Sequence, residues 1–103
     1  MAKPTKFKLP HKLNIYGMSV EIKTIKNLQD DYGYAGQFCT RNKTIELDNK
    51  LEDSELVQTL IHEVLHAIAY RIRLSEAIHK DVEEIVVDSF AQWIEENLII
   101  KFK

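Results

Sequence analysis

The stretch Asp53–Leu74, DSELVQTLIHEVLHAIAYRIRL, decides the fold of this chain of 103 residues. It contains neither Gly nor Pro, and Asp53 or Ser54 stands where a helix N-cap is expected. Apolar residues recur every three or four positions along it: Val57, Ile61, Val64, Leu65, Ile68 and Ile72. This period predicts a long amphipathic helix whose apolar stripe faces the core.

A metal-binding pattern lies in the middle of this predicted helix, His62-Glu63-Val64-Leu65-His66. On a helix the two imidazoles lie roughly 40° apart on one face, and Glu63 projects beside them. H-E-x-x-H on a helix is a known zinc motif, in which the histidines bind the ion and the glutamate is the general base. Both histidines flank the apolar stripe. The alternative is a pair of packed or exposed histidines that binds no metal.

A catalytic zinc site usually takes a third protein ligand and leaves one position for water. The extended motif with a further histidine on the same helix is excluded, because Ala69 and Ile72 occupy the positions of its Gly and His. A second predicted helix, Val82–Leu98, carries Glu84 and Asp88 four residues apart on one face. Glu84 could bind the metal while Asp88 accepts the spare N–H of a ligating histidine. The alternative is an acidic, solvated helix face.

These residues resemble a known family. His62-Glu63-x-x-His66 followed by Glu84-x-x-x-Asp88-x-Phe90 resembles the gluzincin metallopeptidases, and the small size is similar to the minimal ImmA/IrrE-type peptidases of phages and mobile elements. The resemblance covers Lys43 to Trp93. It implies His62, His66 and Glu84 as zinc ligands, Glu63 as general base and Asp88 as a partner of a ligating histidine. Glu83 is the rival ligand if the register differs by one residue.

A peptidase also needs a group that stabilises the negative charge on the carbonyl oxygen during the reaction, the oxyanion. This group is the part of the site that the sequence specifies least. Larger gluzincins supply it from a downstream domain, and only a short segment follows the second helix here. The candidates within this chain are Tyr70, one turn after His66, His79 between the two helices, and Tyr32 or Tyr34. The alternatives are ordinary packing for each tyrosine and a solvated loop position for His79.

The segment before the helices has the period of β-strands. Leu13 and Ile15, then Val20 and Ile22, alternate with polar residues. We further predict a loop at Asn27–Gly33 and a second hairpin formed by Tyr34–Thr40 and Lys43–Asp48. Residues 1–10 are expected to form a flexible N-terminal tail. We therefore expect one α+β domain spanning residues 1–103, with a small, mostly antiparallel sheet of three or four strands followed by two packed helices, as in a minimal zincin.

The order of these parts suggests how a partner binds. If Lys43–Asp48 forms an exposed sheet edge beside the motif helix, an extended peptide could add to it as a further strand. The expected function is hydrolysis of a peptide bond in a protein substrate, with zinc as cofactor. Two alternatives stay open: a metal-bearing module that binds a protein without cutting it, as an antirepressor or regulator does, and an interaction domain without metal.

Charge and cysteine content exclude other classes of function. The net charge is −2 with both signs interspersed, which argues against nucleic-acid binding. No apolar stretch reaches the length of a membrane span, and the N-terminal end lacks the apolar run of a secretory signal. The lone Cys39 cannot form an intrachain disulfide, so we expect a reducing, cytoplasmic location.

Overall fold

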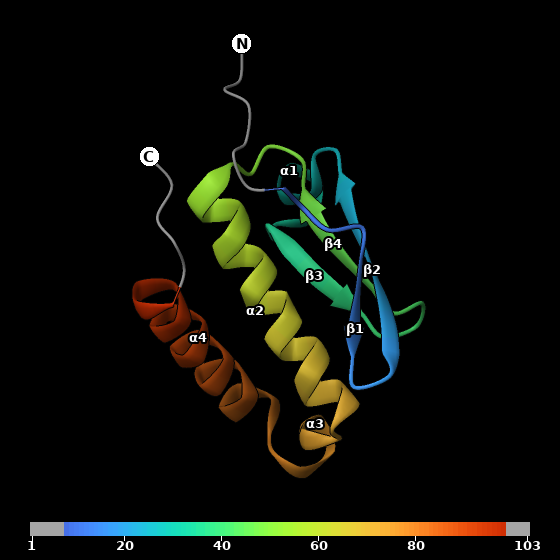
Figure 1. Cartoon of the computed structure of the whole chain (residues 1–103), viewed down its shortest axis with the longest axis vertical. Coiled ribbons are helices and arrows are strands. Elements are labelled where there is room, and N and C mark those ends of the chain that lie inside the picture. Colours follow the sequence, from blue (N-terminus) through green and yellow to red (C-terminus); the bar gives the residue numbers. More distant parts are fainter. Residues whose placement is uncertain (1–7, 99–103) are drawn as a thin grey trace.

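The computed structural model describes residues 8–98 as an α+β unit, as the sequence predicted (Figure 1). Its elements in chain order are β1 (Lys12–Ile15), β2 (Met18–Ile25), α1 (Leu28–Tyr32), β3 (Gly36–Cys39), β4 (Thr44–Asp48), α2 (Asp53–Arg71), α3 (Leu74–Ala77) and α4 (Lys80–Asn97). Most of the predicted N-terminal tail, residues 1–7, lies outside the described residues. The sheet, α2 and α4 follow one another as layers.

The four strands form a mixed sheet in the order β1-β2-β4-β3, which corrects the prediction of a mostly antiparallel one. β1 pairs antiparallel with β2, and β3 with β4, but β2 and β4 run parallel. The physical reason is burial on β4, where Thr44, Ile45, Leu47 and Asp48 are all buried. A strand covered on both faces is most stable between two neighbours, so β4 lies inside the sheet and β3 at its edge.

The expected peptide-binding edge at Lys43–Asp48 is therefore wrong. β4 is paired on both sides, with β2 through Ile22–Ile45 and with β3 through Phe38–Ile45. β3 instead has one unpaired side. The sequence prediction failed because an edge position depends on strand order, which no local pattern specifies.

A helical turn replaces the loop expected at Asn27–Gly33. Helix α1 lies between two residues in the left-handed region, Asn27 at φ 59° and Gly33 at φ 83°. Leu28 anchors it, with 1% of its surface exposed. The buried carboxylate of Asp48 accepts the backbone N–H groups of Gln29 and Lys50, both at 2.8 Å. These two hydrogen bonds lower the pKa of Asp48 and fasten α1 to the end of β4.

The face of helix α2 that packs against the sheet coincides only in part with the predicted stripe, of which Val57 is buried and Val64 and Ile68 contact the core. Its buried apolar residues are Leu56, Val57, Leu60, Ala67 and Ala69, and the core cluster joins several of them to Ile15, Val20, Ile22, Ile45 and Leu47. Ile72 of the stripe predicted on α2 is 54% exposed. On α4, Phe90 and Trp93 of the predicted stripe are 59% and 55% exposed. Hence the two predicted stripes do not face the core along their whole length.

The ends of the long helices differ slightly from expectation. α2 ends at Arg71, because Arg73 adopts a left-handed conformation at φ 66° and starts α3. α4 begins at Lys80, two residues early, because the His79 side chain accepts the backbone N–H of Asp81 at 3.1 Å and caps the helix. Within residues 8–98 no helix combines the length and apolar character that crossing a membrane requires.

Candidate metal centre

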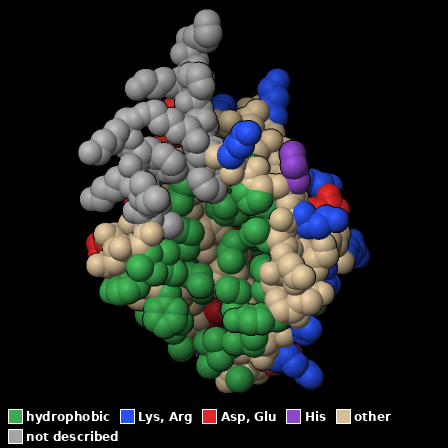
Figure 2. Space-filling view, viewed as in Figure 1, with side chains coloured by type: hydrophobic (Ala, Val, Ile, Leu, Met, Phe, Trp, Pro, Cys, Tyr) green, Lys and Arg blue, Asp and Glu red, His purple; other side chains and the backbone are tan. Residues whose placement is uncertain are grey.

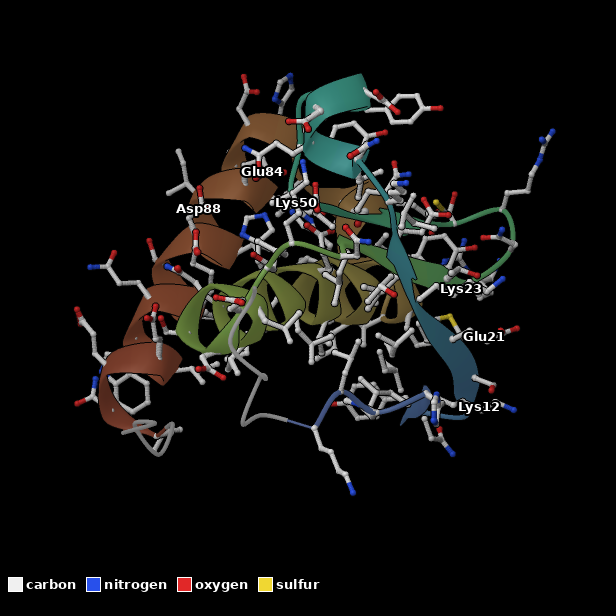
Figure 3. All side chains as sticks on the ribbon, turned by 90° about the horizontal axis from the view of Figure 1, so that it is seen from above. Lys12, Glu21, Lys23, Lys50, Glu84 and Asp88 are labelled. Atoms are coloured by element: carbon white, nitrogen blue, oxygen red, sulfur yellow. The ribbon has the colours of Figure 1, made fainter. Side chains whose placement is uncertain are left out.

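Two helices bring three potential metal ligands together. His62 and His66 project from α2 and Glu84 from α4, and one ligand atom of each lies within 4.8 Å of the others. His66 Nε2 is 3.0 Å from Glu84 Oε1, and His62 Nε2 is 3.7 Å from Glu84 Oε2. Figure 3 shows Glu84 and Asp88 on the side of α4 that faces α2. The histidines of the HExxH segment and Glu84 of the second long helix therefore lie close together, as the sequence analysis predicted.

Each histidine is oriented by a second carboxylate on α4. His62 Nδ1 lies 3.0 Å from Asp88 Oδ1, and His66 Nδ1 lies 2.7 Å from Glu83 Oε2. A carboxylate at Nδ1 favours the tautomer that carries its proton there, which leaves the Nε2 lone pair free for a metal. Both Nε2 atoms point towards Glu84. This is the hydrogen-bonded arrangement that metal-ligating histidines usually have.

Glu83, the rival ligand of the sequence analysis, has a different place in the structure. It lies against the Nδ1 side of His66, away from the atoms that face Glu84. Burial acts to raise the pKa of Glu83, but hydrogen bonds from Ser75 and His66 outweigh it and lower this pKa overall. Glu83 therefore stays ionised and can hold the His66 proton. Its adjacency to Glu84, about 100° away on the helix, was the one sequence signal for this role.

The donor set fits a divalent ion. Two imidazole nitrogens and one carboxylate oxygen suit several first-row transition metals, and three protein groups leave positions open for water or substrate. The negative charge of Glu84, with Asp88 and Glu83 behind the histidines, favours a cation at this point. His62, His66 and Glu84 can thus hold a metal ion between α2 and α4.

Glu63 is the buried acid of the site, with 7% of its surface exposed. Loss of solvation raises the pKa of its carboxyl to about 7; His66 and the backbone N–H of Phe38 oppose the rise, and the negative charge of Glu84 adds to it. A carboxyl with a pKa near neutrality exchanges protons readily at physiological pH, which is the property a general base needs.

The raised pKa of Glu63 predicts a pH-dependent stability for metal-free protein. The folded state keeps a proton that the unfolded state releases between pH 4.5 and about 7, so this contribution is fully present below pH 4.5 and is lost as pH rises to 7. The loss should be about 3 kcal/mol of unfolding free energy. Urea unfolding in the presence of a chelator measures it. Glu63→Gln, which cannot titrate, should lack this component; parallel pH curves for the two proteins would contradict the assignment.

A groove runs past the centre on both sides of Glu63. A cavity of about 640 Å³ lies towards Gln58, Gln92 and Glu95, and one of about 560 Å³ lies towards Tyr70 and Lys80. Both cavities are lined by the same four central residues, Tyr34, Gly36, His62 and Glu63. The walls of the groove are α2, α4 and strand β3, so an extended ligand can pass the metal ligands lengthwise.

Strand β3 presents backbone groups to this groove. Ala35 O accepts the N–H of Asp48 at 2.8 Å, and in an antiparallel pair alternate residues bond to the partner strand. Gly36 and Phe38 therefore direct their backbone groups away from β4, and the Phe38 N–H is bonded to Glu63. A Cβ at Gly36 would lie 2.7 Å from Thr59 Cγ2, so only glycine allows this close approach of β3 to α2. Neither role of β3 could be predicted from the sequence, because both depend on the strand order of the sheet.

The structure separates the oxyanion candidates. Tyr70 lines the groove on the side of His66 and packs edge-on against Phe38, with ring centroids 5.6 Å apart. Tyr34 lines both cavities, and Tyr32 stacks on it. His79 lines neither cavity and instead caps α4 with a largely exposed side chain, so it does not join the site.

Comparisons with protein-family models, with curated proteins and with solved structures found no match to this chain.

Proposed function

We propose that this chain is a zinc-dependent peptidase. The observation that carries the proposal is the gathering of His62, His66 and Glu84, with a separate carboxylate at the Nδ1 atom of each histidine and the buried Glu63 beside them. Two helices supply six side chains with complementary roles at one point of an open groove. Packed or solvated histidines would not require this arrangement.

Zinc held by His62, His66 and Glu84 would polarise a scissile carbonyl and lower the pKa of a water molecule towards about 7. Glu63 takes the proton from the attacking water and returns it to the leaving amine. Asp88 and Glu83 keep the imidazole rings in place and in the required tautomer. Tyr70, on the groove wall beside His66, is the proposed donor to the carbonyl oxygen as negative charge develops there.

The substrate in this proposal is an extended peptide. The groove offers the unpaired edge of β3, where the backbone groups of Gly36 and the carbonyl group of Phe38 point outward, so a peptide can add as a fifth strand beside Glu63, which holds the Phe38 N–H. Strand addition uses main-chain hydrogen bonds, and it places the peptide carbonyl groups along the line of Glu63 and the histidines. Recognition at this edge should depend little on the peptide side chains.

Chelation tests the proposal. Full-length protein loaded with zinc should cleave members of a mixed peptide library, and a chelator should reduce cleavage to background because the ion is released. Adding zinc back should restore the rate, with mass spectrometry of the peptides as the measurement. Cleavage that persists at an unchanged rate after complete zinc removal, verified by elemental analysis, contradicts the proposal.

A further inference from the structure

The groove of the candidate metal centre continues past Tyr70 into a further cavity of about 500 Å³. Tyr70 lines both, and the charged residues of this cavity are Lys43, Arg71, Arg73 and Glu76. The end of α2, α3 and the β1–β2 turn lie together at the lower end of the molecule (Figure 1), and Lys and Arg side chains emerge there (Figure 2). We call this cavity the basic pocket, defined by Tyr70 and these four charged residues.

Lys43 lies where the groove and the basic pocket meet. Its ammonium group donates a hydrogen bond to the carbonyl oxygen of Thr40 at 2.5 Å and lies 5.2 Å from the centre of the Tyr70 ring. Thr40 and Tyr70 both line the groove. Lys43 is half-buried, and the attraction between its charge and the ring holds the ammonium group in place. A ligand that follows the groove past Tyr70 therefore reaches a fixed positive charge.

The two arginines of the basic pocket have different partners. Arg71 Nε donates to the carbonyl oxygen of Tyr16 at 2.9 Å, which leaves the other N–H groups of this guanidinium for a further acceptor. Arg73 is paired with Glu76, through Nε at 2.7 Å and Nη2 at 3.1 Å. Within residues 8–98 no carboxylate contacts Lys43 or Arg71. The basic pocket thus holds two cations that a carboxylate of a ligand can pair with.

The other end of the groove has the opposite charge. The cavity of about 640 Å³ is lined by Asp88, Glu95 and Glu96, and none of its described lining residues is a lysine or an arginine. A carboxylate is repelled at that end and attracted at the basic pocket. The two ends of the groove therefore distinguish the two ends of a charged ligand.

We propose that the basic pocket binds a carboxylate of the peptide substrate and so selects peptides with an acidic group at one end. The inference rests on the proposed peptidase function, whose main-chain pairing at β3 supplies little sequence selectivity. Tyr70 follows His66 by one helical turn, about 6 Å along α2. An extended peptide advances about 3.3 Å per residue, so the carboxylate belongs roughly two to four residues from the bond at the metal.

Peptide binding tests the inference. The protein is the zinc-loaded full chain carrying Glu63→Gln, so that peptides stay intact during calorimetric titration. The peptides are Val-Thr repeats with capped termini and a run of Asp at the first or the last positions, the same peptides with Asn, and the Asn peptide with a free terminal carboxylate.

One of the acidic peptides should bind about 10-fold more tightly than its Asn counterpart, because several charge pairs form in the basic pocket. Salt should reduce this preference. Tighter binding of an Asp peptide identifies side-chain carboxylates as the ligand, and tighter binding of the uncapped Asn peptide alone identifies the terminal carboxylate. Equal dissociation constants for all peptides, or no binding of any, overturn the proposal.

Single substitutions locate the carboxylate. Lys43→Gln and Arg71→Gln should each remove most of the preference for the acidic peptide, because each deletes one of the two cations without a carboxylate partner. Glu76→Gln should strengthen the preference about 3-fold, since Arg73 then loses its partner and can pair with the ligand. A gain of affinity cannot result from a folding defect. A preference that persists undiminished in both Lys43→Gln and Arg71→Gln overturns the proposed location.

Lys12→Gln and Lys23→Gln are the matched controls. Both are exposed lysines of β1 and β2, labelled in Figure 3, and neither lines the groove or the basic pocket. Each control removes one positive charge and should leave the preference unchanged. Zinc content should be equal in all these proteins. Absence of cleavage by wild type would contradict the proposed peptidase, whereas the preference for acidic peptides tests the basic pocket alone.

Discussion

Glu63→Gln is expected to lower the rate of peptide hydrolysis by about 10²–10⁴-fold while the zinc content stays at the wild-type level. The amide keeps the size of the side chain and can still receive the backbone N–H of Phe38. It cannot accept the proton of the attacking water, because an amide nitrogen or oxygen is a far weaker base than a carboxylate. The three ligands, His62, His66 and Glu84, are unchanged. The variant therefore distinguishes a loss of proton transfer from a loss of zinc binding.

The measurement is single-turnover hydrolysis of a peptide that wild type cleaves, with metal content determined on the same preparations. Asp81→Asn is the matched control, since Asp81 is an exposed acid of α4 that lines neither cavity of the groove, and it should cleave at the wild-type rate. A Glu63→Gln protein that cleaves as fast as wild type refutes the role of Glu63. If neither wild type nor Glu63→Gln cleaves any peptide and both bind the same partner equally, the protein is a metal-bearing binding module and not a peptidase.

Removing a ligand should abolish metal binding. In His62→Ala and Glu84→Ala the zinc dissociation constant is expected to rise by more than 100-fold, because two remaining donors cannot complete the coordination of the ion. Asp88→Ala should have a smaller effect, about 10–100-fold, since Asp88 orients His62 without facing the Nε2 atoms. Competition with a zinc-binding dye measures all three constants.

The pair Glu83→Ala and Glu84→Ala decides between the two neighbouring acids. Glu83 contacts His66 Nδ1, so its removal should resemble Asp88→Ala, whereas Glu84 faces the Nε2 atoms of both histidines. Glu96→Ala, an exposed acid at the far end of α4, is the control and should change nothing. A larger loss of affinity with Glu83→Ala than with Glu84→Ala would move the third ligand by one residue.

Local patterns were sufficient for the two long helices. A run of 22 residues without Gly or Pro and with a period of 3.6 can satisfy its hydrogen bonds within itself, so α2 was predictable from Asp53 onward. The same period fixed the relation of His62 to His66. The absence of a further histidine on this helix pointed to α4 for the third ligand, and the structure brings Glu84 to the two histidines.

Tertiary packing decided the features that involve several elements. α1 formed where a loop was expected, because its anchor Leu28 and its partner Asp48 are 20 residues apart in sequence. The parallel pairing of β2 with β4, the free edge at β3 and the fit of Gly36 against Thr59 depend on strand order.

The sequence by itself determined which residues share a helix face, since hydrogen bonds between residues four apart set that spacing. It did not determine what each face meets. α2 has apolar residues on more than one side, and the sheet covers the side of Leu56, Leu60 and Ala67 while Ile72 stays exposed. On α4, adjacent Glu83 and Glu84 reach different nitrogens of His66. Periodicity fixes directions around one axis only, whereas the burial of a face requires a second element, whose position is set by the packing of the whole chain.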